Sequence, residues 1–140
     1  MGIARLMSLL AVGILFCSPL IGTAASAQVA DPNRFKADPD TYKAYKAAQT
    51  YPSVFKAVFC YCGCDKDGNH TSLFDCFRNE HGSSCGICKA EAILTSNMKA
   101  SGADVGAISK SIDSSFGRSY RGAPSPAFQA YKARVKSNWM

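Results

Sequence analysis

The sequence has no run in which apolar and polar residues alternate for long enough to predict a β-strand. It also has no internal repeat. Sheet-based and repeat architectures therefore have no support. Its 140 residues do contain apolar side chains at helical spacing, in segments that end at glycine or proline. This pattern predicts one small all-α domain.

Sequence motifs of catalysis are missing too. The chain contains no Ser-His-Asp pattern, paired-carboxylate motif, phosphate-binding loop or zinc-protease helix. Hydrolytic catalysis therefore has no support, and we expect a binding protein rather than an enzyme.

A dense basic segment is also absent. The formal net charge is +6, but beyond Arg5 the lysines and arginines are spread between Arg34 and Lys136. No basic stripe is interleaved with aromatic residues, and scattered bases are typical of a solvated surface. We expect no nucleic acid among the partners.

Residues 1–27 have the pattern of a secretory signal peptide. Arg5 precedes a compact apolar stretch at 6–16, and Ala25-Ser26-Ala27 supplies the small residues of a cleavage site. The apolar stretch is too short, and too soon followed by proline and glycine, for stable membrane insertion. We expect cleavage after Ala27 and export to the periplasm or the extracellular space.

Cys17 lies at the end of that apolar stretch, where a lipid-modified cysteine could stand. Lipoprotein processing requires small residues directly before the cysteine, and Leu15 and Phe16 are large. We therefore expect no lipid anchor and the loss of Cys17 with the signal peptide. The other six cysteines all lie between Cys60 and Cys88, in a compartment where disulfides can persist.

The mature chain is expected to begin with a flexible leader at 28–39, followed by a helical domain at 40–140 with its motif core at 58–117. Caps, glycine stops and apolar spacing predict helices over residues 40–49, 72–78, 86–99 and 105–116, and a last one that carries Phe128, Tyr131, Val135 and Trp139. Short helices give a thin core, so a staple of metal or disulfides is expected.

One packing contact is specific enough to state. The helix that begins near Gly86 should pack Leu94 and Met98, which share a side with Ile87, against the next helix. That helix presents Ile108, Ile112 and Phe116 on one face.

The segment Cys60-Tyr61-Cys62-Gly63-Cys64 places three thiols within five residues. Disulfides between cysteines two residues apart are strained, whereas thiolates need only point at one ion. Metal binding is therefore favoured. A staple of three disulfides is the alternative. In it these cysteines either reach three separate partners, or Cys60 bonds Cys64 and the other four pair around them.

A second motif, Cys85-Gly86-Ile87-Cys88, stands at the start of a predicted helix, where the helix dipole lowers a thiol pKa. This favours either redox chemistry or metal binding. A thioredoxin-like use would need a βαβ framework, which the sequence lacks.

The two histidines of the chain, His70 and His81, both lie among the cysteines. Neutral imidazole binds metals readily, so we expect them to be ligands or to lie beside the ligands. The predicted metal site consists of eight residues, Cys60, Cys62, Cys64, His70, Cys76, His81, Cys85 and Cys88.

These motifs, together with the runs 68–73 and 75–77, His81 and Glu91-Ala92, resemble the PCYCGC-motif proteins, which are exported or lipid-anchored bacterial proteins of uncharacterised function. The resemblance covers roughly 41–117. Phe59 stands where that motif has proline, and the loop before His70 is one residue longer. The resemblance implies the site and the compartment but names no activity.

Soft thiolate ligands select Cu(I) or Zn(II) over Mg(II) and Ca(II). Six thiols and two imidazoles can fill two tetrahedral zinc sites, or hold copper at lower coordination, and we place Cu(I) slightly ahead. The expected function is capture, buffering or delivery of the ion, with a metal-donor or acceptor protein as partner. The alternatives are a structural interaction domain stapled by disulfides or zinc, and a thiol oxidoreductase that uses Cys85 and Cys88.

Overall fold

The computed structural model describes residues 28–68 and 70–137. All regular structure in this part of the chain is helical, which confirms the predicted all-α class. The α-helices are α1 (Pro39–Thr50), α2 (Pro52–Ala57), α3 (His81–Ser84), α4 (Gly86–Ala100), α5 (Val105–Phe116) and α6 (Pro126–Ser137). Short 3-10 helices are η1 (Pro32–Phe35), η2 (Cys64–Asp67), η3 (Leu73–Phe77) and η4 (Gly117–Ser119). The expected signal peptide at 1–27 and Trp139 lie outside the described residues.

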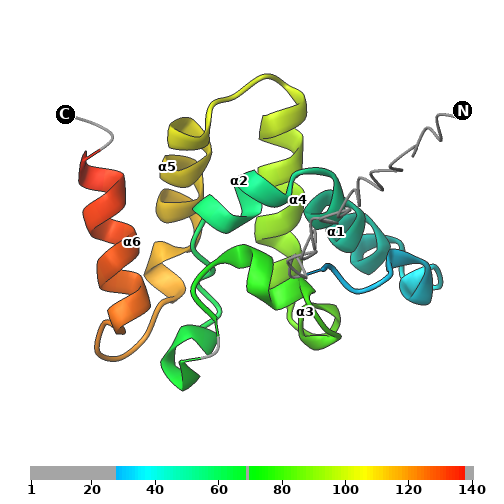
Figure 1. The fold of residues 1–140 in the computed structure, drawn as a ribbon, viewed down its shortest axis with the longest axis horizontal. Coiled ribbons are helices and arrows are strands. Elements are labelled where there is room, and N and C mark those ends of the chain that lie inside the picture. Colours follow the sequence, from blue (N-terminus) through cyan, green and yellow to red (C-terminus); the bar gives the residue numbers. More distant parts are fainter. Residues whose placement is uncertain (1–27, 69, 138–140) are drawn as a thin grey trace, which may run out of the picture.

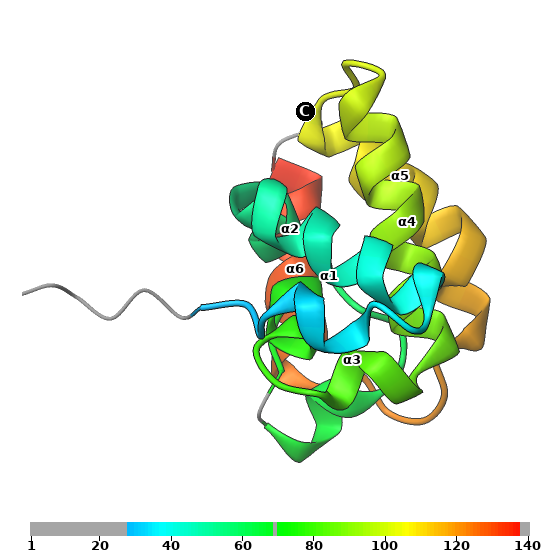
Figure 2. The same cartoon turned by 90° about the vertical axis from the view of Figure 1, so that its right-hand side faces the viewer.

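The helices are arranged around α4. Figure 1 shows α4 near the middle, with α1 at one end of the molecule and α6 at the other. Helix α5 runs beside α4, as the turned view in Figure 2 shows. The cysteine-bearing loop between α2 and η3 lies below these helices in Figure 1, between α6 and α3. Within the described residues, none of the helices combines the length and the apolar character needed to cross a membrane.

Side-chain caps fix where the long helices begin. The Asp38 carboxylate accepts hydrogen bonds from the backbone N–H groups of Asp40 and Thr41, both at 3.1 Å, so α1 begins slightly before the predicted position. Asp104 caps α5, accepting from the Ala107 N–H at 2.7 Å, and the helix begins at Val105 as predicted.

The segment between the cysteine loop and α3 is held by a capping box. The Ser72 side chain and the Asp75 side chain each bond the other's backbone, as the sequence predicts. The turn that follows is a 3-10 helix, η3, and it buries Cys76 and Phe77 completely. Cys76 is thereby fixed on the inner side of the domain.

The expected flexible leader packs against the domain instead. The Ala30 N–H donates a hydrogen bond to the Phe77 carbonyl at 2.9 Å, and Pro32 is buried. The ring centroids of Phe35 and Tyr45 are 4.2 Å apart. These apolar residues belong to no periodic pattern, so the sequence gives no sign that α1 and η3 offer them a surface.

The predicted core contact between α4 and α5 is present, but its deepest layer differs. Ile108 and Ile112 are fully buried, whereas Leu94 and Met98 are only partly buried against the core. The side chains of α4 that are fully buried are Cys88, Glu91, Ala92 and Thr95. The inward face of α4 is therefore the one that carries a cysteine and a carboxyl group, which apolar periodicity could not indicate.

An aromatic cluster joins α6 to the cysteine loop. Phe59 is 1% exposed. The centroid of its ring lies 5.2 Å from the ring centroids of Tyr61 and Phe128 and 5.4 Å from that of Tyr131. Such aromatic contacts stabilise beyond simple burial. Phe59 thus anchors the residue that precedes Cys60 to the last helix.

Candidate metal centre

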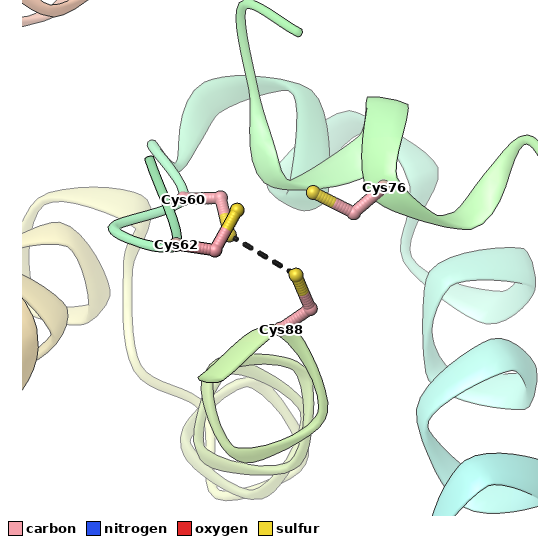
Figure 3. Close-up of side chains that lie close together, drawn as sticks. All are labelled: Cys60, Cys62, Cys76 and Cys88. Atoms are coloured by element: carbon pink, nitrogen blue, oxygen red, sulfur yellow. Dashed lines mark hydrogen bonds between the residues drawn. The ribbon is translucent and has the colours of Figure 1, made fainter. Parts of the chain in front are cut away.

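Four cysteines from three separate segments meet in the interior (Figure 3). Cys60 and Cys62 belong to the loop after α2, Cys76 lies on η3, and Cys88 lies in the first turn of α4. All four sulfur atoms lie within 4.8 Å of one another. We call this set the four-cysteine cluster.

The sulfur separations in this cluster suit a metal ion. The Sγ atoms of Cys60 and Cys88 are 3.5 Å apart, and none of the six described cysteines forms a disulfide. A bonded pair would lie at about 2.0 Å. Four sulfurs around a tetrahedral ion, each about 2.3 Å from it, are separated by about 3.8 Å. The observed spacing is close to that of coordinated thiolates.

Tyr61 holds the loop so that its neighbours face the cluster. The Tyr61 N–H donates a hydrogen bond to Glu91 Oε1 on α4 at 2.9 Å, and its hydroxyl donates to Asp113 Oδ1 on α5 at 2.6 Å. Two helices therefore fix the residue between Cys60 and Cys62. Figure 3 shows the side chains of both cysteines on the side that faces Cys88.

Gly63 turns the chain so that Cys64 returns toward Cys62. Its φ of +88° lies in the left-handed region that glycine adopts at little cost. The two sulfur atoms are consequently 3.0 Å apart, and Cys64 Sγ also lies 3.0 Å from His81 Nε2. Cys62, Cys64 and His81 form a second group with metal-ligand spacing.

Gly82 permits the close approach that brings His81 to Cys76. A Cβ atom at position 82 would lie 2.8 Å from the Cys76 carbonyl oxygen and 2.9 Å from the Phe77 ring. With glycine there, α3 packs directly on η3. His81, His70 and Cys76 then form a third group, in which His70 Nδ1 lies 3.6 Å from Cys76 Sγ.

The close packing of the thiols shifts the pKa values of Cys60 and Cys62 in opposite directions. Hydrogen bonds from Cys60, then from Cys76 and Cys88, lower the pKa of Cys62 far below the ordinary thiol value. The hydrogen bond to Cys62 in turn raises the pKa of Cys60 well above it. Thiols bind a metal ion as thiolates, so metal binding at this cluster would release protons.

Glu91 is a buried carboxyl group beside the cluster that we did not assign from the sequence. It is fully buried, Oε1 accepts the Tyr61 N–H, and Oε2 has no hydrogen-bond partner among the described residues. Desolvation raises its pKa to about 8. The signal that could have found it is its position three residues after Cys88, on the face of α4 that also carries Ala92 and Thr95.

Of the eight residues predicted to converge, seven fall into the three groups and Cys85 falls into none. Cysteines three residues apart share a helix face only where both lie within the helix. Cys85 instead precedes α4 as its N-cap residue, with extended backbone angles of φ −104° and ψ 111°. A residue outside the helical turn does not follow the helical spacing, and Cys85 is half-buried.

Together, fold and site define a small cysteine-rich helical domain with a candidate soft-metal centre. Residues 21–129 match the family described as proteins of unknown function with a PCYCGC motif, and the chain belongs to that family. Phe59 takes the place of the first residue of that motif. Comparison with curated proteins and with solved structures gives no match.

Proposed function

We propose that this protein binds a soft metal ion at the four-cysteine cluster and serves in the capture, buffering or delivery of that ion outside the cytosol. Export rests on the signal-peptide pattern at 1–27 and on the resemblance to exported relatives. The observation that carries the proposal is the convergence of four sulfurs, within 4.8 Å of one another, from segments far apart in the sequence.

The donor set selects the class of ion. Thiolates bind Cu(I) and Zn(II) and discriminate against oxygen-seeking cations such as Mg(II) and Ca(II). Zn(II) would use all four sulfurs and close the site as a structural staple. Cu(I) uses fewer ligands and leaves sulfurs free for exchange, which suits an ion that is handed on. We therefore place Cu(I) ahead of Zn(II).

Thiol oxidoreduction has weaker support. A redox-active Cys-x-x-Cys pair needs an accessible thiolate with its partner beside it. Cys88 is fully buried, and Cys85 lies outside its group. A hydrogen bond with Cys60 lowers the pKa of Cys88. The hydrogen bond with Cys62 and the burial of the thiol outweigh that effect, so the pKa of Cys88 is raised to about 11.

A competition titration tests the proposal. Reduced, metal-free protein is titrated with Cu(I) held by bathocuproine disulfonate and, separately, with Zn(II) held by a chromogenic chelator. We expect one ion to bind tightly, and the Cys60→Ser/Cys88→Ser variant to bind it more than about a hundredfold more weakly.

Cys85→Ser is the matched control, because Cys85 belongs to the same motif but to none of the three groups. We expect this variant to retain the wild-type affinity. If Cys85→Ser weakened binding as much as the double variant, the cluster would be assigned wrongly. If reduced wild-type protein bound neither ion, the cysteines would be covalent staples and metal handling would be the wrong function.

A further inference from the structure

The ligands outside the four-cysteine cluster are connected to it in a chain. Cys62 belongs both to the cluster and to the group with Cys64 and His81. Cys76 belongs both to the cluster and to the group with His70 and His81. Each outer group therefore shares one sulfur with the inner one, and an ion can change partners without leaving coordination.

Burial decreases along this chain of ligands. Cys60, Cys76 and Cys88 are buried, whereas Cys62, Cys64, His70 and His81 are half-buried. His70 and His81 line a surface cavity of about 520 Å³ together with Asp75, Arg78 and Asn79, and none of the cysteines of the cluster lines it. An ion that arrives through this cavity meets the two imidazoles first.

The spacing of the outer side chains is that of ligands. Cys64 Sγ lies 3.0 Å from His81 Nε2, and Cys76 Sγ lies 3.6 Å from His70 Nδ1. The centroids of the two imidazole rings are 4.9 Å apart, in an edge-on arrangement. Gly82 is required for this placement, because any side chain there would collide with η3. The fold thus brings both histidines of the chain to one opening.

We propose that the two outer groups, Cys62-Cys64-His81 and His70-Cys76-His81, form an outer metal site around their shared His81, which takes up the soft ion and passes it to the four-cysteine cluster through the sulfurs of Cys62 and Cys76. This inference rests on the proposed function of the cluster. The transfer is a ligand exchange without redox change. Each bond from the ion to an outer nitrogen or sulfur breaks as one to an inner sulfur forms, and each inner thiol that becomes a ligand releases its proton to solvent.

The direction of transfer follows from the donor sets. Soft ions prefer thiolates to imidazole, and the inner site offers four sulfurs where the outer one mixes sulfur and nitrogen. The inner site therefore holds the ion at equilibrium, and the outer site sets the rate at which it is filled. Loss of the outer nitrogens should slow loading and leave the affinity of the inner site unchanged.

Stopped-flow transfer of one equivalent of Cu(I) from its bathocuproine complex, at one pH near neutrality, tests this. We expect the His70→Ala/His81→Ala variant to load about tenfold more slowly than wild type and to reach the same equilibrium occupancy. Cys64→Ser should slow loading as well. Arg78→Lys, which alters the same cavity without changing its charge or removing a soft ligand, should load at the wild-type rate.

The outcomes separate the two proposals. If the wild-type protein binds neither Cu(I) nor Zn(II), the proposed function and the outer site both fail. If it binds only Zn(II), the same transfer is measured with Zn(II) from its chelator. If it binds normally and the double histidine variant loads at the wild-type rate, only the outer site is wrong. If the double variant loses equilibrium binding while circular dichroism shows an intact fold, the histidines belong to the inner site and there is no relay.

Discussion

Glu91→Gln should remove a large part of the pH dependence of stability. The folded protein raises the pKa of Glu91 from 4.5 to about 8 because the carboxyl group is desolvated. A raised carboxyl pKa favours folding most below 4.5, and this contribution is lost as pH rises toward 8. Between those values the unfolded chain is ionised at this residue while the folded chain keeps its proton.

The size of the effect follows from that shift. In this window the free energy of unfolding falls by about 1.4 kcal/mol per pH unit, so roughly 2.5 kcal/mol is lost between about pH 5 and about pH 7. Glutamine keeps the oxygen that accepts the Tyr61 N–H and cannot ionise. The Glu91→Gln variant should therefore lack this share of the decline.

Urea denaturation of reduced, metal-free protein at several pH values measures how the free energy of unfolding falls with pH. The readout is the difference between wild type and variant, because the titration of the other groups largely cancels. Glu80→Gln is the matched control, since it makes the same chemical change at a side chain that is 60% exposed, whereas Glu91 is buried. Equal slopes for wild type and Glu91→Gln would show that Glu91 is ionised in the folded state, contrary to its assigned environment.

Three further predictions concern the core, the site and processing. Ile112→Ala should destabilise by about 2–5 kcal/mol, because Ile112 is fully buried, and a loss below about half a kcal/mol in denaturant titration would contradict the core assignment. Gly82→Ala should displace α3 and slow Cu(I) loading, because the new Cβ would lie 2.8 Å from the Cys76 carbonyl oxygen, and an unchanged rate would refute the role given to that contact. Mass spectrometry of the native protein should find Gln28 as the first residue, and a lipid-modified N-terminus would overturn the expected processing.

Local signals explain what could be predicted from the sequence. Helix α5 was predictable because an aspartate cap at Asp104, apolar spacing and the stop at Gly117 all lie within one short segment. The capping box at Ser72 and Asp75 is local in the same way. Residues 60–64 indicated a candidate metal site because cysteines two residues apart make poor disulfides and good ligands.

The division of the eight predicted ligands depended on tertiary contacts and could not be predicted. The sequence gives the same weight to Cys85 and Cys88, and only the extended backbone at the start of α4 separates them. Likewise, nothing in the sequence separates the inner cysteines from Cys64, because that distinction arises from the turn at Gly63. Glu91 was missed because a carboxyl group on a helix is ordinarily solvated, and here the packing of α4 buries it.

The most direct test of the central claim is X-ray absorption spectroscopy of the reduced protein loaded with one equivalent of Cu(I) or of Zn(II). If the four-cysteine cluster is the resident site, the bound ion should have only sulfur neighbours, at about 2.3 Å. The Cys85→Ser variant should give the same spectrum. A spectrum dominated by nitrogen or oxygen neighbours would contradict the assignment of the ion to Cys60, Cys62, Cys76 and Cys88.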